Sequence, residues 1–277
     1  MKPGLQEITL EIIACGRTDK GLVRPNNEDG FYIDDKVGLL VAADGMGGHA
    51  SGEIASKLAI DVIRDYFRAF KEGLAPLIGK LDEEYSETSK AIGSSLHLAN
   101  KAVYEAANSN AGWQGMGTTI AAVVINKNRL SIAHVGDSRV YLIRAGDIEQ
   151  LTDDHSVVYE QVKRELLTRE EAQKSEIRNL LTKALGIASD VEVDISELTL
   201  SSGDILVLCT DGLNSMVSDD DILTLAVSTK DPAAVCDSMV ELANEQGGKD
   251  NITVIVGYVR NKSWISFLLK FKEWFRR

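Results

Sequence analysis

The chain has few cysteines and no long apolar run, and each shortage removes a class of protein. Its three cysteines, Cys15, Cys209 and Cys236, lie far apart without a Cys-x-x-Cys spacing, so we expect reduced thiols within the core. No apolar stretch approaches the roughly 18 residues that a membrane span needs. The N-terminal segment "MKPGLQEITLEII" has acids where a signal peptide needs an apolar centre. A cytoplasmic protein is therefore expected.

Basic residues are also in short supply, which limits the expected partners. The chain has 30 lysines and arginines against 42 aspartates and glutamates, and its formal net charge is −12. Binding to nucleic acid needs a basic face that releases counterions, so no nucleic-acid partner is expected. An acidic chain is compatible with metal cations. No Pro/Gly/Ser-rich linker divides the 277 residues, which predicts one domain over 1–260 and a short tail over 261–277.

Short apolar runs bounded by turn residues predict a strand-rich protein. They cover 30–35, 37–43, 117–125, 129–136, 139–146, 204–212 and 251–259. Residues 117–151 have the pattern of a meander, with tight connections at 126–128, 136–138 and 145–147. Connections of this length imply antiparallel pairing of the strands that they join.

Amphipathic patterns predict helices over 52–71, 88–108 and 232–246. The first has Ile54, Leu58, Val62, Tyr66 and Phe70 at every fourth position, with Ala55, Ala59, Ile63 and Phe67 filling the same stripe. The third has Asp231 as its N-cap and Pro232 at its first position. Since strands dominate and helices come in pairs, an α+β layered architecture with antiparallel sheets is favoured over a doubly wound parallel sheet.

The charged segment 153–185 is predicted to be a helical excursion above the sheet. Within it, Thr168 and Glu171 have the spacing of a capping box.

Four aspartates stand where an apolar strand meets a glycine-containing turn. Asp44 follows "LLVAA", Asp137 follows "IAHVG", Asp211 follows "ILVLCT" and Asp250 precedes "ITVIV". One such junction carries little weight, because an aspartate in a turn commonly bonds to the turn itself. Asp34, Asp147 and Asp204 also flank strands. The set of four, with its glycines, indicates that these strand ends converge.

The stretch "VAADGMGGHASGE" at 41–53 has the glycines of a phosphate cradle but an aspartate and no lysine. Converging carboxylates need cations between them, and hard oxygen ligands select Mg²⁺ or Mn²⁺. Two such ions about 4 Å apart activate a hydroxide for in-line displacement at phosphorus. Lacking a Cβ, Gly45 lets its carbonyl approach a metal. Arg24 offers a guanidinium to a phosphate, although a surface arginine paired with a nearby acid is the alternative.

Seven sequence blocks, in order, resemble the metal-dependent protein phosphatases of type 2C, the PPM family, in a bacterial form. They are "RPNNED", "ADGMGG", "GMGTT", "VGDSRVYL", "LTDDHS", "TDGL" and "GGKDNITVIV". The resemblance runs from about Thr18 to Val259 and covers nearly the whole chain. It implies a four-layer αββα fold, in which a central β-sandwich of two antiparallel sheets is flanked by α-helices. The metal centre of such a fold lies at one end of the sandwich.

Carried over position by position, the resemblance implies a set of metal ligands. Asp44 would bridge two Mn²⁺ or Mg²⁺ ions and the Gly45 carbonyl would bind one of them, while Asp211 and Asp250 would bind the other. Glu28 and Asp29 would hold metal-bound waters. Asp137 would join Asp211 around a third, more weakly held ion.

The same resemblance implies roles around the metals. Arg24 would take the substrate phosphate and act with Asp44, Asp211 and Asp250 as a catalytic residue, and Asn251 would support Asp250. The segment 153–185 matches the family's flap, which lies beside the active site and influences substrate choice.

Two positions depart from the family's pattern. Some members have a histidine where this chain has Met46, as a candidate general acid for the leaving alkoxide, and Met46 cannot donate a proton. His49 is near in sequence, but is expected to be a partly exposed polar residue. A metal-bound water is therefore the preferred proton donor. In the flap, Ser175 and Glu176 replace a His-Pro pair of many bacterial relatives, so substrate preference is not carried over.

Together these features predict a monomeric serine/threonine protein phosphatase that acts on phosphoserine and phosphothreonine in proteins and opposes a serine/threonine kinase. Attack by a metal-activated hydroxide needs no nucleophilic cysteine, which agrees with the absence of a CxxxxxR motif. The alternative is a non-catalytic phosphoprotein sensor on the same fold. A P-loop ATPase is disfavoured because Ala243 and Asp250 replace the motif's first glycine and its Ser/Thr. A metal-dependent nuclease would need a basic track.

The tail "NKSWISFLLKFKEWFRR" has five basic residues against one acidic residue, with aromatic side chains at helical spacing between Trp264 and Arg277. This pattern suits a peripheral helix at an anionic inner membrane surface. Docking onto the chain's own domain or onto a protein partner is an equal alternative.

Overall fold

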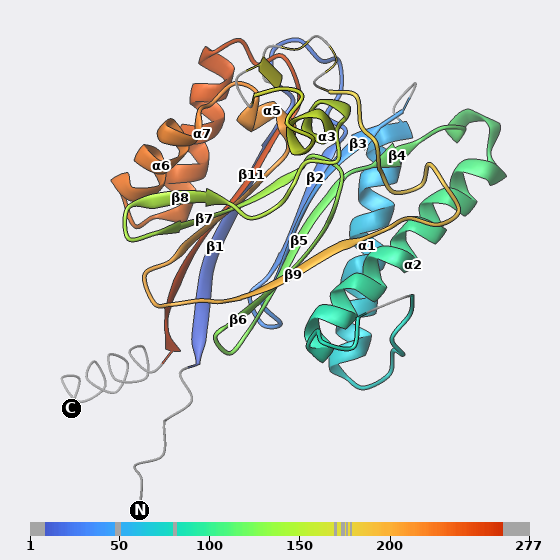
Figure 1. The fold of residues 1–277 in the computed structure, drawn as a ribbon, viewed down its shortest axis with the longest axis horizontal. Coiled ribbons are helices and arrows are strands. Elements are labelled where there is room, and N and C mark those ends of the chain that lie inside the picture. The colour runs from blue at the N-terminus through green and yellow to red at the C-terminus, as the bar shows by residue number, and fades with distance from the viewer. Residues whose placement is uncertain are drawn as a thin grey trace, which may run out of the picture.

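The computed structural model describes residues 9–47, 51–79, 82–168, 171–172, 175, 177 and 179–262. Two antiparallel sheets pack face to face, and a pair of helices covers the outer face of each (Figure 1). Helices α1 (Ser51–Lys71) and α2 (Glu87–Ser109) cover one sheet, while α6 (Asp219–Ser228) and α7 (Pro232–Glu245) cover the other. The predicted α+β fold with a four-layer αββα arrangement is confirmed.

Each sheet is built from antiparallel neighbours. The first has the order β1 (Leu10–Asp19), β11 (Ile252–Asn261), β10 (Ile205–Cys209), β7 (Arg139–Arg144) and β8 (Asp147–Gln150). The second has the order β2 (Asp29–Asp34), β3 (Leu39–Met46), β5 (Ile120–Asn126), β6 (Arg129–Val135) and β9 (Asp194–Thr199), and β4 (Gly117–Thr118) pairs with the end of β3. Shorter helical turns are η1 (Ala111–Trp113), α3 (Val157–Lys163) and α5 (Asp211–Asn214).

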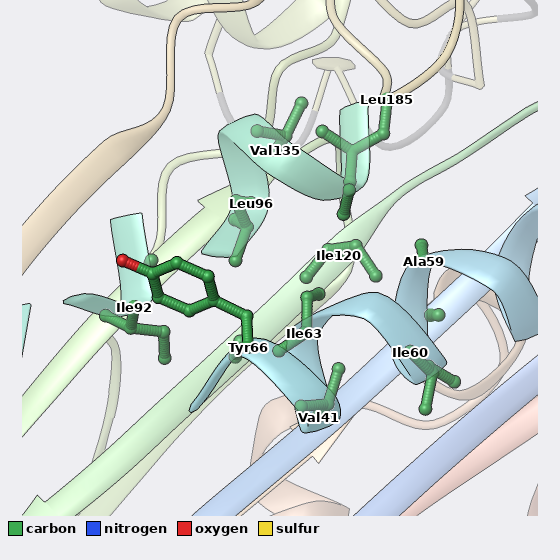
Figure 2. Close-up of a cluster of buried hydrophobic side chains, with 14 of the residues drawn as sticks. Val41, Ala59, Ile60, Ile63, Tyr66, Ile92, Leu96, Ile120, Val135 and Leu185 are labelled. Atoms are coloured by element: carbon green, nitrogen blue, oxygen red, sulfur yellow. The ribbon is translucent and has the colours of Figure 1, made fainter. Parts of the chain in front are cut away.

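The central strands are apolar on both faces because both faces are buried. In β3, Leu39 and Val41 pack in the cluster beneath α1 and α2, in which Figure 2 labels Val41, whereas Leu40 and Ala42 pack between the sheets. In β10, Val207 packs towards α6 and α7. Alternate residues of a strand point to opposite faces, so a strand in the middle of four layers has no polar side. This explains the continuous apolar runs of the sequence.

The predicted meander over 117–151 is wrong at one connection. The strands on either side of 136–138 do not pair, because β6 belongs to the second sheet, where it pairs with β9, and β7 belongs to the first. Gly136 has a φ of 106° and turns the chain from one sheet to the other. A Cβ there would lie 2.5 Å from side-chain carbons of Thr119, so only glycine fits. Asp137 is thereby placed at the end of the sandwich, between the sheets.

The predicted helices are confirmed, with a shift of the buried stripe in the first. In α1 the set Ala55, Ala59, Ile63 and Phe67 is fully buried, while Ile54, Leu58 and Val62 are only partly buried. Strands β1 and β9 were not predicted, because their apolar residues are interrupted by polar ones.

The predicted helix-terminal bonds are also present. The Thr168 N–H donates to Glu171 at 2.8 Å, and the Glu171 N–H donates to Thr168 Oγ1 at 3.2 Å. The Asp231 side chain caps α7, and Pro232 opens that helix.

Two predictions fall outside the described residues. They concern His49 and the tail segment Trp264–Arg277. Among the described residues, no helix is both long enough and apolar enough to cross a membrane.

Candidate active site

Five aspartates from both sheets lie at one end of the sandwich. Their positions follow from strand direction, since neighbouring strands are antiparallel and the end of one lies beside the start of the next. In the second sheet, β2 starts and β3 and β6 end there; in the first, β10 ends and β7 and β11 start there. These strand ends carry Asp29, Asp44, Asp137, Asp211 and Asp250, which we call the acid cluster.

Direct contacts bring the two sheets together at the acid cluster. Asp29 and Asp44 are register partners on β2 and β3, an arrangement that places like charges directly opposite each other. The Thr210 hydroxyl, at the end of β10, donates to Asp29 Oδ2 across the sandwich at 2.8 Å. Asp29 Oδ1 and Asp211 Oδ1 are buried and have no hydrogen-bond partner among the described residues. Such orphaned acceptors are costly unless a cation satisfies them.

The carboxyl groups of the acid cluster oppose one another's ionisation. Burial is the first cause and neighbouring carboxylates add to it, and together they raise the pKa of Asp29 to about 7. The pKa of Asp211 is raised to about 6 by burial and by the charge of Asp250. Burial and the surrounding aspartates also raise the pKa values of Asp44 and Asp137 well above the usual range. Full ionisation at neutral pH therefore requires positive charge between the carboxylates.

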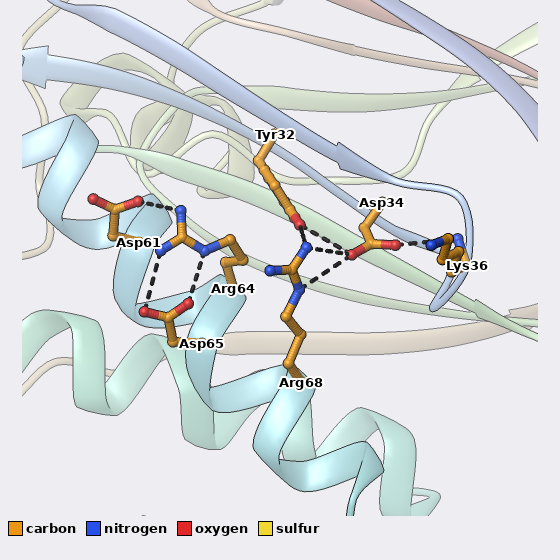
Figure 3. Close-up of polar contacts among 7 residues, drawn as sticks. All are labelled: Tyr32, Asp34, Lys36, Asp61, Arg64, Asp65 and Arg68. Atoms are coloured by element: carbon orange, nitrogen blue, oxygen red, sulfur yellow. Dashed lines mark hydrogen bonds and ion pairs between the residues drawn. The ribbon is translucent and has the colours of Figure 1, made fainter.

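Two of the other acids that flank strands, Asp34 and Asp204, are neutralised by arginines. Asp34, at the far end of β2, lies 3.0 Å from Arg68 and accepts a hydrogen bond from Tyr32 (Figure 3). Asp204, before β10, is bonded by both Arg144 Nε at 2.9 Å and Nη2 at 2.7 Å. The acid cluster differs from these pairs because it gathers five carboxyl groups instead of joining one carboxylate to one arginine. Its oxygen donors fit a divalent cation such as Mg²⁺ or Mn²⁺.

Arg24 reaches the acid cluster from the loop before β2. Its Nη2 lies 2.6 Å from Asp250 Oδ2, and its side chain is 52% exposed. The hydrogen bond to Asp250 raises the pKa of Arg24, and the charges of Asp211 and Asp44 contribute. Arg139 is also near, but it is engaged by Asp154 through two bonds of 2.8 and 2.7 Å. Arg24 is thus the more accessible of these two guanidinium groups.

Asn251 ties this loop to the acid cluster. Its Oδ1 accepts from the Glu28 N–H at 2.8 Å, and its Nδ2 donates to the carbonyls of Lys20 and Asn26. Its backbone N–H donates to Asp250 Oδ1 at 2.9 Å. The predicted partnership with Asp250 therefore runs through the backbone, while the side chain fixes the loop that carries Arg24 and Glu28.

Two glycines allow backbones to meet at the acid cluster. A Cβ on Gly45 would lie 2.1 Å from the Gly52 carbonyl oxygen and 2.5 Å from that of Glu28. A Cβ on Gly212 would lie 1.9 Å from the carbonyl oxygen of Asn251. Glycine at position 45 therefore serves the packing of β3 against the start of α1, in addition to any contact with a ligand.

Hydroxyl groups around Asp44 were not predicted as functional from the sequence. Thr118 Oγ1 donates to the Asp44 carbonyl at 2.8 Å, and Thr119 Oγ1 accepts from the Asp44 N–H at 3.3 Å. Thr119 Oγ1 also lies 2.6 Å from Ser138 Oγ, beside Asp137. The block "GMGTT" was the one sequence feature that could have indicated them. In the structure its two threonines contact Asp44 directly and the neighbour of Asp137.

Met46 occupies the last position of β3, paired with Gly117 of β4. Its side chain is half-buried and has no proton to donate. A proton for a leaving oxygen must come from another group.

Comparison with known proteins gives consistent matches. Residues 24–253 match the family model described as protein phosphatase 2C. The chain is 36% identical over 243 residues to the serine/threonine phosphatase stp of Listeria welshimeri, which covers 87% of this chain and 93% of that protein. It is 37% identical over 255 residues to the serine/threonine protein phosphatase PstP of Mycobacterium tuberculosis, covering 92% of this chain and 46% of that protein. The chain thus spans about half the length of PstP.

A solved structure agrees with these sequence matches. The catalytic domain of PstP in complex with two manganese ions superimposes with a TM-score of 0.79 at 35% identity, covering 91% of this chain and 100% of that one.

Proposed function

Since the chain belongs to the protein phosphatase 2C (PPM) family of serine/threonine protein phosphatases, we propose that it hydrolyses phosphoserine and phosphothreonine on proteins at the acid cluster, with Mn²⁺ or Mg²⁺ as its cofactor. The observation that carries this proposal is the acid cluster itself. Two sheets bring five carboxylates to one place, with Asp29 directly opposite Asp44. Among the described residues, the exposed Arg24 at Asp250 is the one arginine that forms an ion pair with these five carboxylates.

The residues assigned to the metal ions follow the family's pattern and suit the local chemistry. Asp44 and the Gly45 carbonyl, with Asp211 and Asp250, would hold two ions, and Glu28 and Asp29 would bind their waters. Asp137 with Asp211 would hold a third ion more weakly. When bound, the ions would neutralise the carboxylates and activate water for in-line displacement at phosphorus.

Arg24 is the residue of this chain that would bind the substrate phosphate. Its guanidinium is half-exposed and rests on Asp250, so a phosphate can share or replace that carboxylate as its partner. Asn251 and Glu28 hold the loop that positions it. Because Met46 has no proton to give, water is the proton donor that we assign to the leaving oxygen.

Hydrolysis of a phosphothreonine peptide tests the proposal. The protein should release phosphate in the presence of Mn²⁺, lose that activity with a chelator, and recover it when Mn²⁺ is restored. Asp204→Asn, which removes a buried acid at the opposite end of β10, is the matched control and should retain the activity. Turnover that persists in excess chelator would refute a metal-dependent mechanism.

The wider roles remain proposals from the sequence. We assign residues 1–260 to the catalytic domain, place the protein in the cytoplasm, and propose that it acts as a monomer opposing a serine/threonine kinase. The tail 261–277 would contact an anionic membrane surface, the chain's own domain or a protein partner. Cosedimentation with anionic liposomes, with and without 261–277, distinguishes these outcomes, and equal binding of the two forms would exclude the membrane contact.

A further inference from the structure

A buried pair of histidines with one carboxylate lies beside the turn that carries Asp137. The rings of His134, on β6, and His155 stack with their centroids 4.7 Å apart. A donor atom from each histidine and one from Asp194, on β9, all lie within 4.8 Å of one another. Both histidines are buried. Two imidazoles and a carboxylate are a common metal-binding set, so the hydrogen bonds must decide between a metal site and a hydrogen-bonded network.

The hydrogen bonds favour the network. The Gly136 N–H donates to His155 Nδ1 at 3.1 Å, so Nδ1 carries a lone pair and the neutral ring holds its proton on Nε2. That Nε2 lies 3.3 Å from Asp194 Oδ2, close enough for an electrostatic contact, although it has no aligned hydrogen-bond partner among the described residues. A histidine that binds a metal usually donates from its other nitrogen instead of accepting there. His134 Nε2 lies 2.8 Å from the Asp153 carbonyl and must donate to it.

His155 bonds to Gly136 twice. Besides the bond to its ring, the His155 N–H donates to the Gly136 carbonyl at 2.9 Å. Both polar groups of Gly136 are therefore held by one residue, at the glycine whose φ of 106° redirects the chain between the sheets. The next residue is Asp137, which is only 9% exposed and belongs to the acid cluster. The position of its carboxylate thus depends on a turn that His155 fixes.

Residues 180–183, at the C-terminal end of the flap segment, contact His155 and a residue close to it in the chain. The Thr182 N–H donates to the His155 carbonyl at 2.8 Å, and the Val157 N–H donates to the Leu180 carbonyl at 2.9 Å. In the same part of the flap segment, Lys183 Nζ lies 3.5 Å from Asp194 Oδ1. The close contact with the His155 ring is the main cause of a lowered pKa for Asp194, which keeps this carboxylate ionised. Asp194 therefore lies between His155 and Lys183 of the flap segment.

We propose that His155, oriented by Asp194, is a positioning residue that holds Asp137 in the acid cluster and connects it to the base of the flap. The inference rests on the proposed function, in which Asp137 contributes to the third and weakest metal site. Loss of the bond to Gly136 would then weaken that site and leave the two tighter sites intact. Among the described residues, no hydrogen bond or ion pair joins Asp44 or Asp250 directly to His134, His155 or Asp194, and the nearest link to Asp44 runs through Thr119.

Two substitutions at position 155 distinguish the roles of the two ring nitrogens of His155. His155→Gln places an amide near the position of Nε2 and removes the acceptor for the Gly136 N–H, whereas His155→Asn places an amide oxygen near the position of Nδ1 and keeps it. Titration of the purified protein with Mn²⁺, with free Mn²⁺ followed by electron paramagnetic resonance, measures tight and weak binding together. His155→Gln should weaken the weak site about tenfold, and His155→Asn should restore most of that affinity. Asp194→Asn should also weaken it.

Asp204→Asn controls for a general loss of stability, because it breaks the ion pair of the buried Asp204 with the exposed Arg144 at the far end of the sandwich. It should leave both classes of Mn²⁺ site unchanged. Weak-site affinity in His155→Gln equal to that of the wild type would overturn the inference, and so would equal losses in His155→Gln and His155→Asn. If His155→Gln does not fold, the comparison of Asp194→Asn with Asp204→Asn decides by the same criterion. A wild-type protein that binds no Mn²⁺ would instead overturn the proposed function.

Discussion

At the scale of single residues, the acid cluster shows a conflict between folding and function. Asp29 and Asp44 face each other on paired strands, where like charges destabilise a sheet. Buried oxygens of Asp29 and Asp211 have no hydrogen-bond partner in the part of the chain that the structure describes. A sequence selected only for stability would place neutral or apolar residues at such positions. The arrangement becomes favourable only when a cation binds, so substitutions here should change activity and stability in opposite directions.

Asp44→Asn tests this opposition. The change removes a carboxylate from the acid cluster, so Mn²⁺-dependent hydrolysis of a phosphothreonine peptide should fall at least about 100-fold. The metal-free protein should gain up to about 1 kcal/mol, because a like-charge pair is removed, which corresponds to about 2–4 °C in melting temperature. Thermal melts in chelator measure the second effect.

Asp34→Asn is the matched control on the partner strand. It removes an acid that is paired with Arg68, so it should keep the activity and lower the melting temperature. Equal destabilisation by Asp44→Asn and Asp34→Asn would contradict the electrostatic account.

Arg24→Ala addresses phosphate binding at the same scale. Removal of the guanidinium should raise the Michaelis constant by about tenfold to 100-fold, the usual effect of losing a hydrogen bond to a charged group. Turnover at saturating substrate should change less. Arg17→Ala removes an arginine on β1 that pairs with Asp237, and it should leave both constants unchanged. A loss confined to turnover would argue against a role for Arg24 in phosphate binding.

At the scale of secondary-structure elements, the strands and helices could largely be predicted from the sequence, but not how they join. The apolar runs and the helical stripes follow from local periodicity, which a sequence displays directly. The change of sheet at Gly136 could not be predicted, because a tight turn can join two paired strands or cross a sandwich. The neighbours of Gly136, Thr119 and His155, are distant in the chain, so only the folded structure reveals them.

The candidate site was predictable to the same degree. The acidic residues follow strand ends, so their convergence could be inferred from "ADG", "GDS" and "TDG" together. The supporting contacts of Thr210, Asn251 and Thr119 could not, since each joins segments that local sequence patterns do not relate.

Gly45→Ala tests the junction of β3 with α1. A methyl group at this position would lie 2.1 Å from the Gly52 carbonyl oxygen, and neither backbone can withdraw without moving Asp44 or the start of α1. We expect a loss of about 3 kcal/mol or more in the free energy of unfolding, together with loss of activity. Urea denaturation and peptide hydrolysis measure the two effects. Gly112→Ala, where the nearest neighbouring atom lies 3.3 Å away, should be close to neutral. Similar stabilities of these two variants would refute the packing argument.

At the scale of the whole molecule, the two ends of the sandwich differ in how far their acidic side chains are paired with arginines. Towards the far end, Asp34 and Asp204 each have an arginine. At the other end, the five carboxyl groups of the acid cluster have one ion pair among the described residues, between Arg24 and Asp250, and Asp44, Asp211 and Asp250 are all partly exposed to ions from solution. The buried carboxyl groups come from both sheets, and so does the free-energy cost of burying them. Metal binding should therefore stabilise the entire sandwich and not one loop.

The pH dependence of stability provides the test of this last point. Asp29 and Asp211 have ordinary pKa values near 3.8 when unfolded and raised values of about 7 and about 6 in the metal-free fold. Between these limits the folded state binds more protons than the unfolded chain, so the free energy of unfolding must fall as pH rises, by up to about 1.4 kcal/mol per pH unit for each proton. The contribution is fully present below about pH 4 and is lost by about pH 7.

Mn²⁺ competes with these protons, so the rise in melting temperature on adding Mn²⁺ should be larger at about pH 8 than at about pH 5. Melting curves of the protein in chelator and in Mn²⁺ across this range measure the difference. Asp29→Asn removes the carboxyl group with the pKa of about 7, so its metal-free melting temperature should depend less on pH than that of the wild type. Asp204→Asn, which retains the acid cluster, should keep the wild-type dependence. A metal-free protein that becomes more stable from about pH 5 to about pH 8, in parallel with Asp29→Asn, would show that the buried carboxyls do not limit the stability of the fold.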